Sequence, residues 1–372
     1  MPKVLITGGA GFIGGTLGRR MASEGHEVVA LDNLLQQVHG VDPLIDPAMN
    51  LVTADVCDVG AVMAAMEGVD VVHHLAAETG VGQSQYEVAR YVRTNSYGTA
   101  VVLEAAVAAR VAHVVIVSSR AVYGEGRHRC PSCGVGFVAG ARRVVDMDSA
   151  TWEVACPGCG GPGEAAPTAE HVAPAPTSIY GLTKLQQEQL AHSMSRIHGI
   201  PLTVLRLFNV FGPGQSMNNP YVGLLGTFFR RARAGTPIEV YEDGLMLRDF
   251  VFIDDVVEVL ARCSGNPTAF GRTWNVGTGA AVTVREIAGA MFEVLGLEPD
   301  VYVSGRYRVG DVRHAVADVS ALERDLGYRP ATPFIDGLRR FASWAGDGPG
   351  DALDVAAEEQ LADRQLLRRA AL

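Results

Sequence analysis

The chain has 372 residues, of which 48% are hydrophobic and 19% are charged, and its formal net charge is −10. This composition is typical of a globular protein with one large or two moderate cores. The acidic balance, with no basic patch to offset it, argues against a nucleic-acid partner. No run of 18 apolar residues occurs, so no membrane span is predicted. The first residues lack the features of a signal peptide, and we expect a cytoplasmic protein.

The N-terminal segment has the pattern of a phosphate-binding turn. Residues 3–7 form a short apolar run, Gly8, Gly11 and Gly14 follow, and a helical pattern continues to residue 23. With Gly9, the same run also fits G-x-G-x-x-G. Glycines in this place let the backbone approach a pyrophosphate, which then lies on the N-terminus of the helix. A strand before the motif and a helix after it favour a dinucleotide site.

The second strand-like run, residues 27–31, ends at Asp32. A carboxylate in this position can accept both ribose hydroxyls of an adenosine, and it repels a 2′-phosphate. No Lys or Arg occurs between Met21 and Ala89, so no nearby cation would neutralise that phosphate. The sequence therefore predicts NAD rather than NADP.

Strand-like and helix-like runs alternate as far as residue 117. Strict alternation predicts an α/β fold with a doubly wound parallel (Rossmann) sheet. Ligands of such sheets bind at the carboxyl ends of the strands. The polar or small residues at these ends are therefore candidates for the site: Asp32, Asp55, Ala76, Ala77, Ser118 and Ser119.

Tyr180 and Lys184 lie four residues apart at the start of a predicted helix that ends near residue 198. Residues at this spacing share a helix face. An ammonium group near a phenol lowers the phenol's pKa from about 10 and favours the phenolate. Such a pair can remove a proton from an alcohol. The alternative is an aromatic residue and a solvated lysine on a surface helix.

Together, these motifs resemble the extended short-chain dehydrogenase/reductase family of nucleotide-sugar enzymes, over nearly the whole chain to about residue 345. The matching segments are Gly8-x-x-Gly11-x-x-Gly14, Leu75-Ala76-Ala77, Ser118-Ser119-x-x-Val122-Tyr123-Gly124, Tyr180-x-x-x-Lys184, residues 206–213, residues 248–251, residues 308–311 and residues 326–330. A narrower likeness, to the dTDP-L-rhamnose 4-epimerase branch, rests on residues 31–34, 37–40, 80–84 and 307–314 and on an insertion that contains cysteines.

The family resemblance implies a role for each matching residue. Ser119 would hydrogen-bond the reacting sugar hydroxyl, Tyr180 would act as the base, and Lys184 would be its partner and hold the nicotinamide ribose. The implied cofactor residues are Gly8, Gly11, Phe12, Ile13, Gly14, Asp32, Asn33, Asp55, Val56, Leu75, Ala76, Ala77 and Phe208. The implied ligands of the nucleotide diphosphate and its ribose are Asn209, Arg248, Arg308 and Asp311. The resemblance also implies a homodimer.

One departure from the family narrows the predicted reaction. Members that dehydrate the sugar carry an acidic pair directly after the catalytic serine or threonine, whereas this chain has Arg120 and Ala121. We therefore expect an NAD-dependent nucleotide-sugar 4-epimerase that acts on a 6-deoxyhexose through a 4-keto intermediate. A net dehydrogenase, reductase or decarboxylase of the same substrates is the alternative, and a catalytically silent binding protein is a third hypothesis.

The insertion lies between Ser119 and Tyr180, and we place it at about residues 125–175. It contains Cys130, Cys133, Cys156 and Cys159 in the pattern C-x2-C-x22-C-x2-C. Four thiolates at such spacings predict a structural zinc site of the zinc-ribbon kind, because they leave no open coordination position. We expect residues 137–138 and 151–154 to form a hairpin between the two turns. Free thiols or disulfides are the alternative.

The predicted organisation has three parts. Residues 1–212 form the NAD-binding domain, to which residues 248–276 return. Residues 213–345 form a smaller nucleotide-sugar-binding domain. Residues 346–372 form a C-terminal tail that we expect to be a solvated helix.

Overall fold

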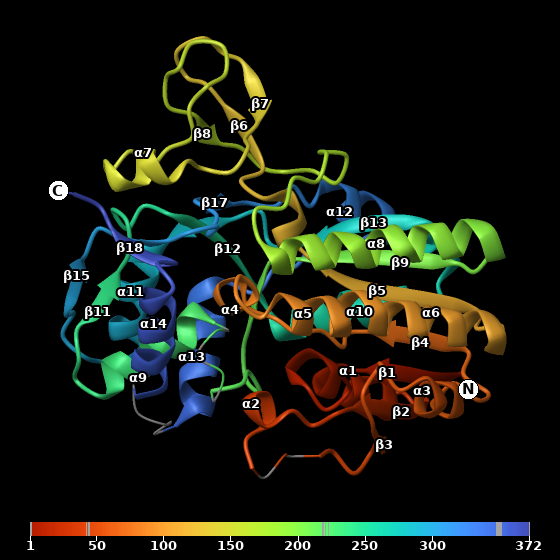
Figure 1. Ribbon diagram of the computed structural model, residues 1–372. Coiled ribbons are helices and arrows are strands. Elements are labelled where there is room, and N and C mark those ends of the chain that lie inside the picture. Colours follow the sequence, from red (N-terminus) through yellow and green to blue (C-terminus); the bar gives the residue numbers. More distant parts are fainter. Residues whose placement is uncertain are drawn as a thin grey trace.

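The computed structural model describes residues 2–41, 43, 45–217, 219, 221, 223–346 and 352–371. Figure 1 shows a body built around a parallel sheet, a second body beside it, and a small lobe that projects from the pair. None of the helices in these described ranges is both long and apolar enough to cross a membrane.

A seven-stranded sheet forms the larger body, and all its neighbouring strands run parallel. In order across the sheet, the strands are β13 (Arg272–Val276), β9 (Leu202–Leu207), β5 (His113–Ser119), β4 (Val71–His74), β1 (Lys3–Thr7), β2 (Glu27–Asp32) and β3 (Asn50–Thr53). The chain leaves β1 toward β2 and β3 and then returns to β4 on the other side of β1. The order reverses there, which is where such sheets bind ligands. The predicted parallel Rossmann-like sheet is confirmed.

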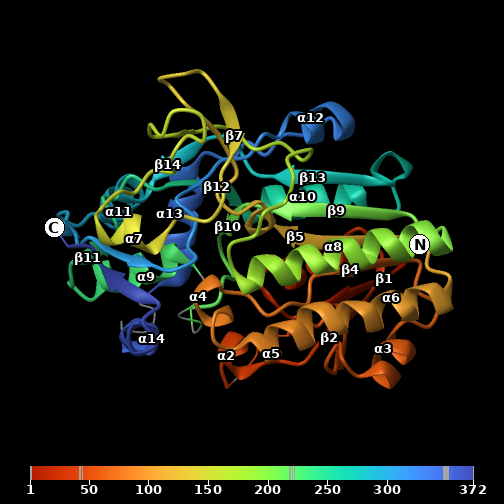
Figure 2. The same cartoon turned by 45° about the horizontal axis from the view of Figure 1, so that its top comes forward.

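Helices cover both faces of this sheet, because its central strands are apolar on both sides. Ile6 packs into the layer that contains α1 (Phe12–Ser23) and α10 (Ile253–Cys263), whereas Leu5 packs into the opposite layer. That opposite layer consists of α3 (Val59–Ala65), α6 (Gly98–Ala109) and α8 (Ile179–His198). Figure 2 shows α6 and α8 side by side. Shorter elements of this body are α2 (Gln36–His39), α4 (Val81–Ser84), α5 (Val88–Tyr91), the π-helical turn η1 (Val92–Tyr97), the 3-10 turns η2 (Arg120–Tyr123) and η3 (Pro267–Ala269), and α12 (Ser320–Leu326).

The smaller body contains two short sheets and three helices. One sheet holds β10 (Asn209–Phe211), β12 (Leu247–Phe252), β14 (Ala281–Thr283) and β17 (His314–Ala315), and the other pairs β11 (Ile238–Val240) with β15 (Val301–Val303). The helices are α9 (Leu224–Arg233), α11 (Val284–Leu295) and α13 (Phe334–Ala345). We expected the chain from Arg248 onward to rejoin the main sheet. Strand β12 instead pairs with β10, because the chain leaves the main sheet after β9 and offers β12 a partner there. Only β13 returns.

The insertion forms the projecting lobe. Its three-stranded antiparallel sheet consists of β7 (Gly136–Val138), β6 (Arg127–Arg129) and β8 (Glu164–Ala165), and α7 (Val144–Asp148) follows β7 along the chain. The expected hairpin between residues 137–138 and 151–154 is wrong. Strand β7 pairs with β6 instead. Strand β6 precedes the first cysteine turn and β7 follows it, so the hairpin forms between two strands that are close in sequence.

The C-terminal tail packs onto the smaller body, so the expectation of a solvated helix is wrong. Helix α14 (Ala352–Asp363) buries Ala357 and Leu361, which are 6% and 3% exposed. Strand β18 (Leu367–Arg369) pairs antiparallel with β16 (Arg306–Arg308). The apolar side chains of the tail are therefore buried by packing. The mixed charges in the sequence of the tail do not reveal this packing.

Candidate active site

The turn between β1 and α1 brings backbone atoms together at positions that only glycine fits. A Cβ on Gly14 would lie 2.1 Å from the Gly8 carbonyl oxygen, and Gly8 itself has a φ of 69°. Gly11 begins α1 with no side-chain cap, and the first turn of α1 contains no acidic residue. The amides of Phe12 and Ile13 are thus left for an anion at the positive end of the helix. This turn fits the pyrophosphate of a dinucleotide.

Asp32 stands at the end of β2, next to this turn. Its carboxylate accepts hydrogen bonds from the backbone amides of Ala10 (3.1 Å) and Leu34 (2.9 Å). The His39 imidazole lies 3.3 Å from it and is the one nearby basic group that a search for Lys and Arg overlooks. Each bond fixes the carboxylate where the adenosine ribose of a dinucleotide would lie.

Two further strand ends are tied to the same edge. The Asn33 amide donates to Asp55 at 3.2 Å, and the Thr7 hydroxyl accepts from the Ala76 amide at 3.2 Å. The Thr7 carbonyl accepts from the Leu75 amide at 3.1 Å. The remaining predicted cofactor residues follow strands of the same sheet: Val56 after β3, Ala77 after β4 and Phe208 after β9.

Tyr180 lies in the first turn of α8, directly against the turn that follows Ser119. The Ser178 hydroxyl caps the helix by accepting from the Gly181 amide at 3.1 Å. A Cβ on Gly181 would lie 2.5 Å from the Ala121 carbonyl oxygen, so the two segments are in direct backbone contact. The Ser119 side chain lies near the Tyr180 phenol and lowers its pKa. The structure thus brings together two of the three predicted catalytic residues.

The electrostatic surroundings of Tyr180 and Lys184 differ from the simple pair that the sequence suggests. Burial raises the pKa of Tyr180, while Ser119 and the Arg120 guanidinium oppose that rise. Burial lowers the pKa of Lys184 to about 7, although the Glu188 carboxylate counteracts this. The sequence drew attention to Arg120 only because dehydrating members of the family carry an acid at its position. In the structure, its positive charge favours the phenolate form of Tyr180.

Buried hydrogen bonds below α8 hold the catalytic helix in place, and sequence reasoning missed them. His74 bonds Thr7 at 2.7 Å and Thr99 at 2.8 Å, and the Gln187 amide donates to Thr99 at 2.6 Å. Burial, with the Lys184 charge, lowers the pKa of His74 to about 3, so the ring is neutral. His74 is thus a hydrogen-bonded core histidine.

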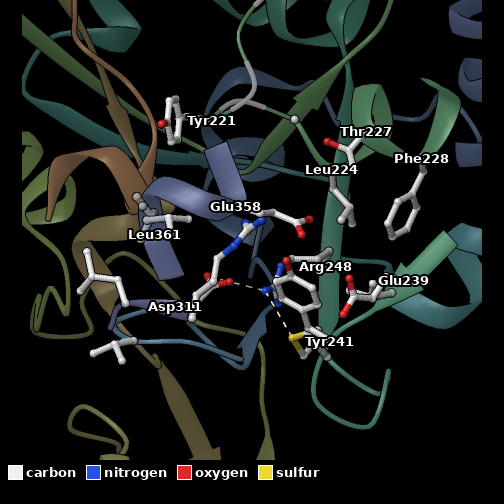
Figure 3. Close-up of a pocket in the computed structure, with 18 of the residues that line it drawn as sticks. Tyr221, Leu224, Thr227, Phe228, Glu239, Tyr241, Arg248, Asp311, Glu358 and Leu361 are labelled. Carbon is white, nitrogen blue, oxygen red and sulfur yellow. Dashed lines mark hydrogen bonds and ion pairs between the residues drawn. The ribbon is translucent and has the colours of Figure 1, made fainter. Parts of the chain in front are cut away.

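A pocket opens between the smaller body and the tail, and Figure 3 shows its lining. Arg248 and Asp311 approach each other to 3.9 Å, and the Arg248 guanidinium also donates to three backbone carbonyls. The Arg308 guanidinium carbon lies 5.1 Å from the centre of the Tyr241 ring. Within the described residues, Arg308 Nε and the Tyr241 hydroxyl are buried without a hydrogen-bond partner. Three of the four predicted nucleotide ligands therefore line one pocket.

Asn209, the fourth, begins β10 and is not part of this lining. Its buried Oδ1 also lacks a partner among the described residues. Tyr241 and Arg231 line the pocket without having been predicted. Arg231 lies on a strongly amphipathic helix, and that pattern alone does not say which of its charged residues faces a ligand.

Comparison with known proteins identifies the family. The model of the NAD dependent epimerase/dehydratase family matches residues 4–136 and 138–277. The chain is 38% identical to dTDP-L-rhamnose 4-epimerase of Burkholderia thailandensis over 351 residues, which cover 92% of this chain and 94% of that protein. It is 30% identical to a dTDP-glucose 4,6-dehydratase of Streptomyces antibioticus, over 93% of this chain and 92% of the relative.

The chain belongs to the NAD-dependent epimerase/dehydratase family.

Solved structures agree with this assignment. MoeE5 in complex with UDP-glucuronic acid and NAD is 30% identical with a TM-score of 0.74, and UDP-glucose 4-epimerase of Thermotoga maritima with UDP-glucose is 27% identical with a TM-score of 0.75. Each comparison covers 92% of this chain and 98% of the other. The prediction of an enzyme of the epimerase class is confirmed.

In this family member, the C-terminal tail forms one wall of the pocket. Glu358, Leu361 and Leu366 of the tail all contribute to the lining. The Glu358 carboxylate lies 2.9 Å from Arg306 and 3.1 Å from Arg231. Strand β18 pairs with the strand that carries Arg308, whose Cα partner is Leu367. The tail therefore fixes the backbone of a predicted nucleotide ligand.

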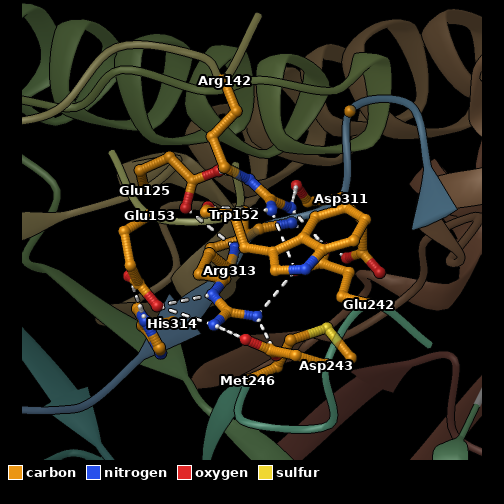
Figure 4. A network of polar contacts seen from close by, with 12 residues as sticks. Glu125, Arg142, Trp152, Glu153, Glu242, Asp243, Met246, Asp311, Arg313 and His314 are labelled. Atoms are coloured by element: carbon orange, nitrogen blue, oxygen red, sulfur yellow. Dashed lines mark hydrogen bonds and ion pairs between the residues drawn. The ribbon is translucent and has the colours of Figure 1, made fainter. Parts of the chain in front are cut away.

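The insertion is tied to the smaller body by a network of buried ion pairs, shown in Figure 4. Arg142 of the insertion contacts the Glu125 carboxylate at 3.0 Å and the Glu242 carboxylate at 2.8 Å. It also donates to the backbone carbonyl of Asp311 at 3.1 Å. Arg313 joins Glu242 to Glu153 of the insertion, with contacts of 2.9 and 2.6 Å. The insertion is thus connected to a residue of the pocket.

The four cysteines of the insertion lie together. Their sulfur atoms all lie within 4.8 Å of one another, and Cys130 and Cys159 approach to 3.5 Å. Cys133 and Cys156 approach to 3.6 Å. Four sulfur ligands at such separations fit a tetrahedral metal ion.

Proposed function

We propose that this chain is an NAD-dependent nucleotide-sugar 4-epimerase whose substrate is a dTDP-6-deoxyhexose such as dTDP-L-rhamnose. The observation that carries this proposal is the 38% identity with dTDP-L-rhamnose 4-epimerase over almost the full length of both chains. The Ser119–Tyr180 contact beside the glycine turn supplies the chemistry that the proposal requires.

The glycine turn, Asp32 and the ends of β3 and β4 would hold NAD. When bound, NAD would accept a hydride from the sugar carbon and return it. Tyr180 takes the proton of the C4 hydroxyl while Ser119 hydrogen-bonds its oxygen. The resulting 4-keto sugar rotates in the site and presents its opposite face to the cofactor. Its diphosphate stays bound to Arg248 and Arg308 meanwhile, because guanidinium groups bind phosphate in a bidentate manner. Tyr180 then gives the proton back to the opposite epimer.

The residues after Ser119 favour epimerisation over dehydration. Loss of water from C6 requires an acid next to the sugar. Arg120 and Ala121 stand directly after Ser119, and neither is an acid. These two positions therefore supply no acid for dehydration, and the proposed 6-deoxyhexose has no C6 hydroxyl to lose, so the return of the hydride to the 4-keto sugar completes the proposed reaction.

The insertion would bind one structural zinc ion through Cys130, Cys133, Cys156 and Cys159. Four thiolates saturate the ion and leave no position for substrate. The lobe has few large apolar residues, so metal binding would supply folding free energy that burial does not. Its connection through Arg142 to Asp311 supports a role in holding the nucleotide pocket in shape.

A panel of nucleotide sugars tests the proposal. The purified protein is incubated with NAD and with dTDP- and UDP-linked hexoses and 6-deoxyhexoses, and proton NMR records inversion at each ring carbon. We expect inversion at C4 of dTDP-L-rhamnose. Steady accumulation of NADH absorbance during turnover would instead favour a net dehydrogenase, and no turnover with any sugar would favour a binding protein.

A further inference from the structure

Arg120 is a half-buried arginine beside the predicted catalytic tyrosine, and none of the described residues gives it a hydrogen bond or an ion pair. Its Nη1 atom is fully buried without a partner. A buried donor without an acceptor is costly, because it loses water and gains nothing in return. Such a group is expected where a ligand completes the site.

The position of Arg120 is fixed by the backbone on both sides. It opens the 3-10 turn η2 directly after Ser119, and the Ser119 hydroxyl caps this turn by accepting from the Ala121 amide at 3.2 Å. The same turn is in direct contact with the start of α8 at Gly181. The backbone of Arg120 is therefore held between Ser119 and the start of the helix that carries Tyr180.

The charges around Arg120 leave a surplus of positive charge. Arg248, Asp311 and Glu125 are the charged groups that face it. Glu125 is already engaged, since it lies 3.0 Å from Arg142 and accepts from the Arg313 amide at 2.8 Å. Asp311 is faced by four guanidinium groups, those of Arg248, Arg308, Arg120 and Arg142. Arg142 is already paired with Glu125 and Glu242, which leaves one carboxylate for the other three guanidinium groups.

We propose that Arg120 binds the phosphate that carries the sugar, and so extends the diphosphate site of Arg248 and Arg308 toward Tyr180. This inference rests on the proposed nucleotide-sugar activity and names the residue that connects the nucleotide pocket with the catalytic tyrosine. A nucleoside diphosphate brings the negative charge that the cluster lacks. This contact would hold the phosphate end of the sugar near the Tyr180 phenol while the sugar ring rotates between removal and return of the hydride.

The pKa of Arg120 is consistent with this role. Burial and the positive charge of Arg248 lower it to about 10, so the side chain stays protonated at neutral pH. Binding of a phosphate would remove both the unpaired donors and part of the repulsion between the two arginines.

Calorimetry on the full chain loaded with NAD tests the inference, with dTDP and dTMP as probes. Arg120→Met should weaken dTDP binding by about tenfold or more, the order expected for a lost charge-assisted hydrogen bond. Binding of dTMP, which lacks the second phosphate, should change by less than about twofold. Arg120→Lys keeps the charge and should recover part of the dTDP affinity. Arg127→Met, on an exposed position of β6, serves as the matched control and should bind both probes like the wild type.

Several outcomes would overturn the inference. Unchanged dTDP affinity in Arg120→Met would do so, and so would an equal loss for dTDP and dTMP. Loss of affinity for UDP-glucuronate alone, with dTDP unaffected, would assign Arg120 to a sugar carboxylate instead. If Arg120→Met fails to bind NAD, Arg120→Lys is measured instead, and its loss of affinity for dTDP is compared with its loss of affinity for dTMP.

The two proposals can be told apart. A wild-type protein that binds neither dTDP nor UDP would refute the nucleotide-sugar proposal itself. A wild-type protein that binds dTDP, with an Arg120→Met variant that binds it equally well, would refute only the inference about Arg120.

Discussion

Tyr180 is the residue on which the proposed chemistry depends. Ser119 and the Arg120 charge both lie near its phenol and both lower its pKa, which favours the phenolate that the proposed proton transfer needs. Tyr180→Phe should lower kcat by about 100-fold or more, because a positioned base contributes at least that factor. The affinity for NAD should stay within about twofold, since the hydroxyl has no role in the glycine turn.

The matched control for this substitution is Tyr97→Phe, which removes a hydroxyl from a side chain that is 51% exposed. This variant should keep wild-type turnover. If Tyr180→Phe retained more than about a tenth of the activity, another group would have to serve as the base.

The pH dependence reports on Arg120. The phenol is faced by Ser119 and Arg120 at the start of η2 and by Tyr91 from α5, and Lys184 lies one turn further along the helix that carries the phenol. In the proposed mechanism the base is the phenolate, so the rate should rise as the pH passes the pKa of Tyr180. Arg120→Met removes a charge that lowers this pKa, and the rising limb should move to higher pH. Arg120→Lys should move it less, whereas an unmoved profile in the Met variant would show that the guanidinium does not act on the phenol.

At the level of single residues, the sequence was most informative where chemistry lies in a short stretch of chain. The glycine turn, the Tyr180–Lys184 spacing and the four cysteines can each be read within a few residues. Arg120 escaped notice because its meaning depends on charges far along the chain, at Arg248 and Asp311. No local pattern marks a guanidinium as unpaired.

The C-terminal tail is the element whose role the sequence concealed. Its partners lie far away along the chain, as in the pairing of Glu358 with Arg306 across 52 positions. A mixture of charges on a terminal segment is equally compatible with a solvated helix. Only the folded chain shows that these charges belong to the wall of a pocket.

Undocking the tail should weaken binding of the nucleotide sugar. Leu361 is 3% exposed and lies against Gly82, so Leu361→Asp places a charge in an apolar contact. We expect KM for the nucleotide sugar to rise by about tenfold or more, because β18 would no longer hold the strand of Arg308. Val355→Asp, on the same helix but 47% exposed, is the control. An equal KM in both variants would show that the tail is dispensable.

The insertion should depend on its metal for order. Cys156→Ser should release the zinc, make the segment from about residue 125 to 175 sensitive to protease, and raise KM for the nucleotide sugar while NAD binding persists. The rise in KM would follow from the loss of the Arg142 and Glu153 contacts to the smaller body. Ser132→Ala, in the first cysteine turn, should change none of these properties. Protein purified without chelators and found free of zinc would contradict the proposal.

At the scale of the whole molecule, four parts of the chain meet around the candidate site. The larger body supplies the glycine turn and Tyr180, the smaller body supplies Arg248 and Asp311, and the insertion and the tail contact the pocket from two sides. The alternation of strands and helices predicted the parallel sheet, because each unit of that sheet is contiguous in sequence. The route of β12 and the pairing within the lobe were mispredicted, because strand partners outside a repeating βα pattern are chosen by tertiary geometry.

The expected homodimer also belongs to this scale. The family resemblance implies that α6 and α8 pair with their copies across a two-fold axis. These helices lie side by side on one face, and Leu182 of α8 is 42% exposed there. The dimer stays a prediction that the mass of the protein in solution would test.

The central claim is that hydride leaves C4 and returns to the opposite face of the same sugar. The most direct measurement uses dTDP-L-rhamnose labelled with deuterium at C4, incubated with the NAD-loaded enzyme and followed by proton NMR. The account predicts inversion at C4 with the deuterium retained on that carbon and no accumulation of NADH. Inversion with deuterium lost to solvent, or a 4-keto product that accumulates with reduced cofactor, would contradict it.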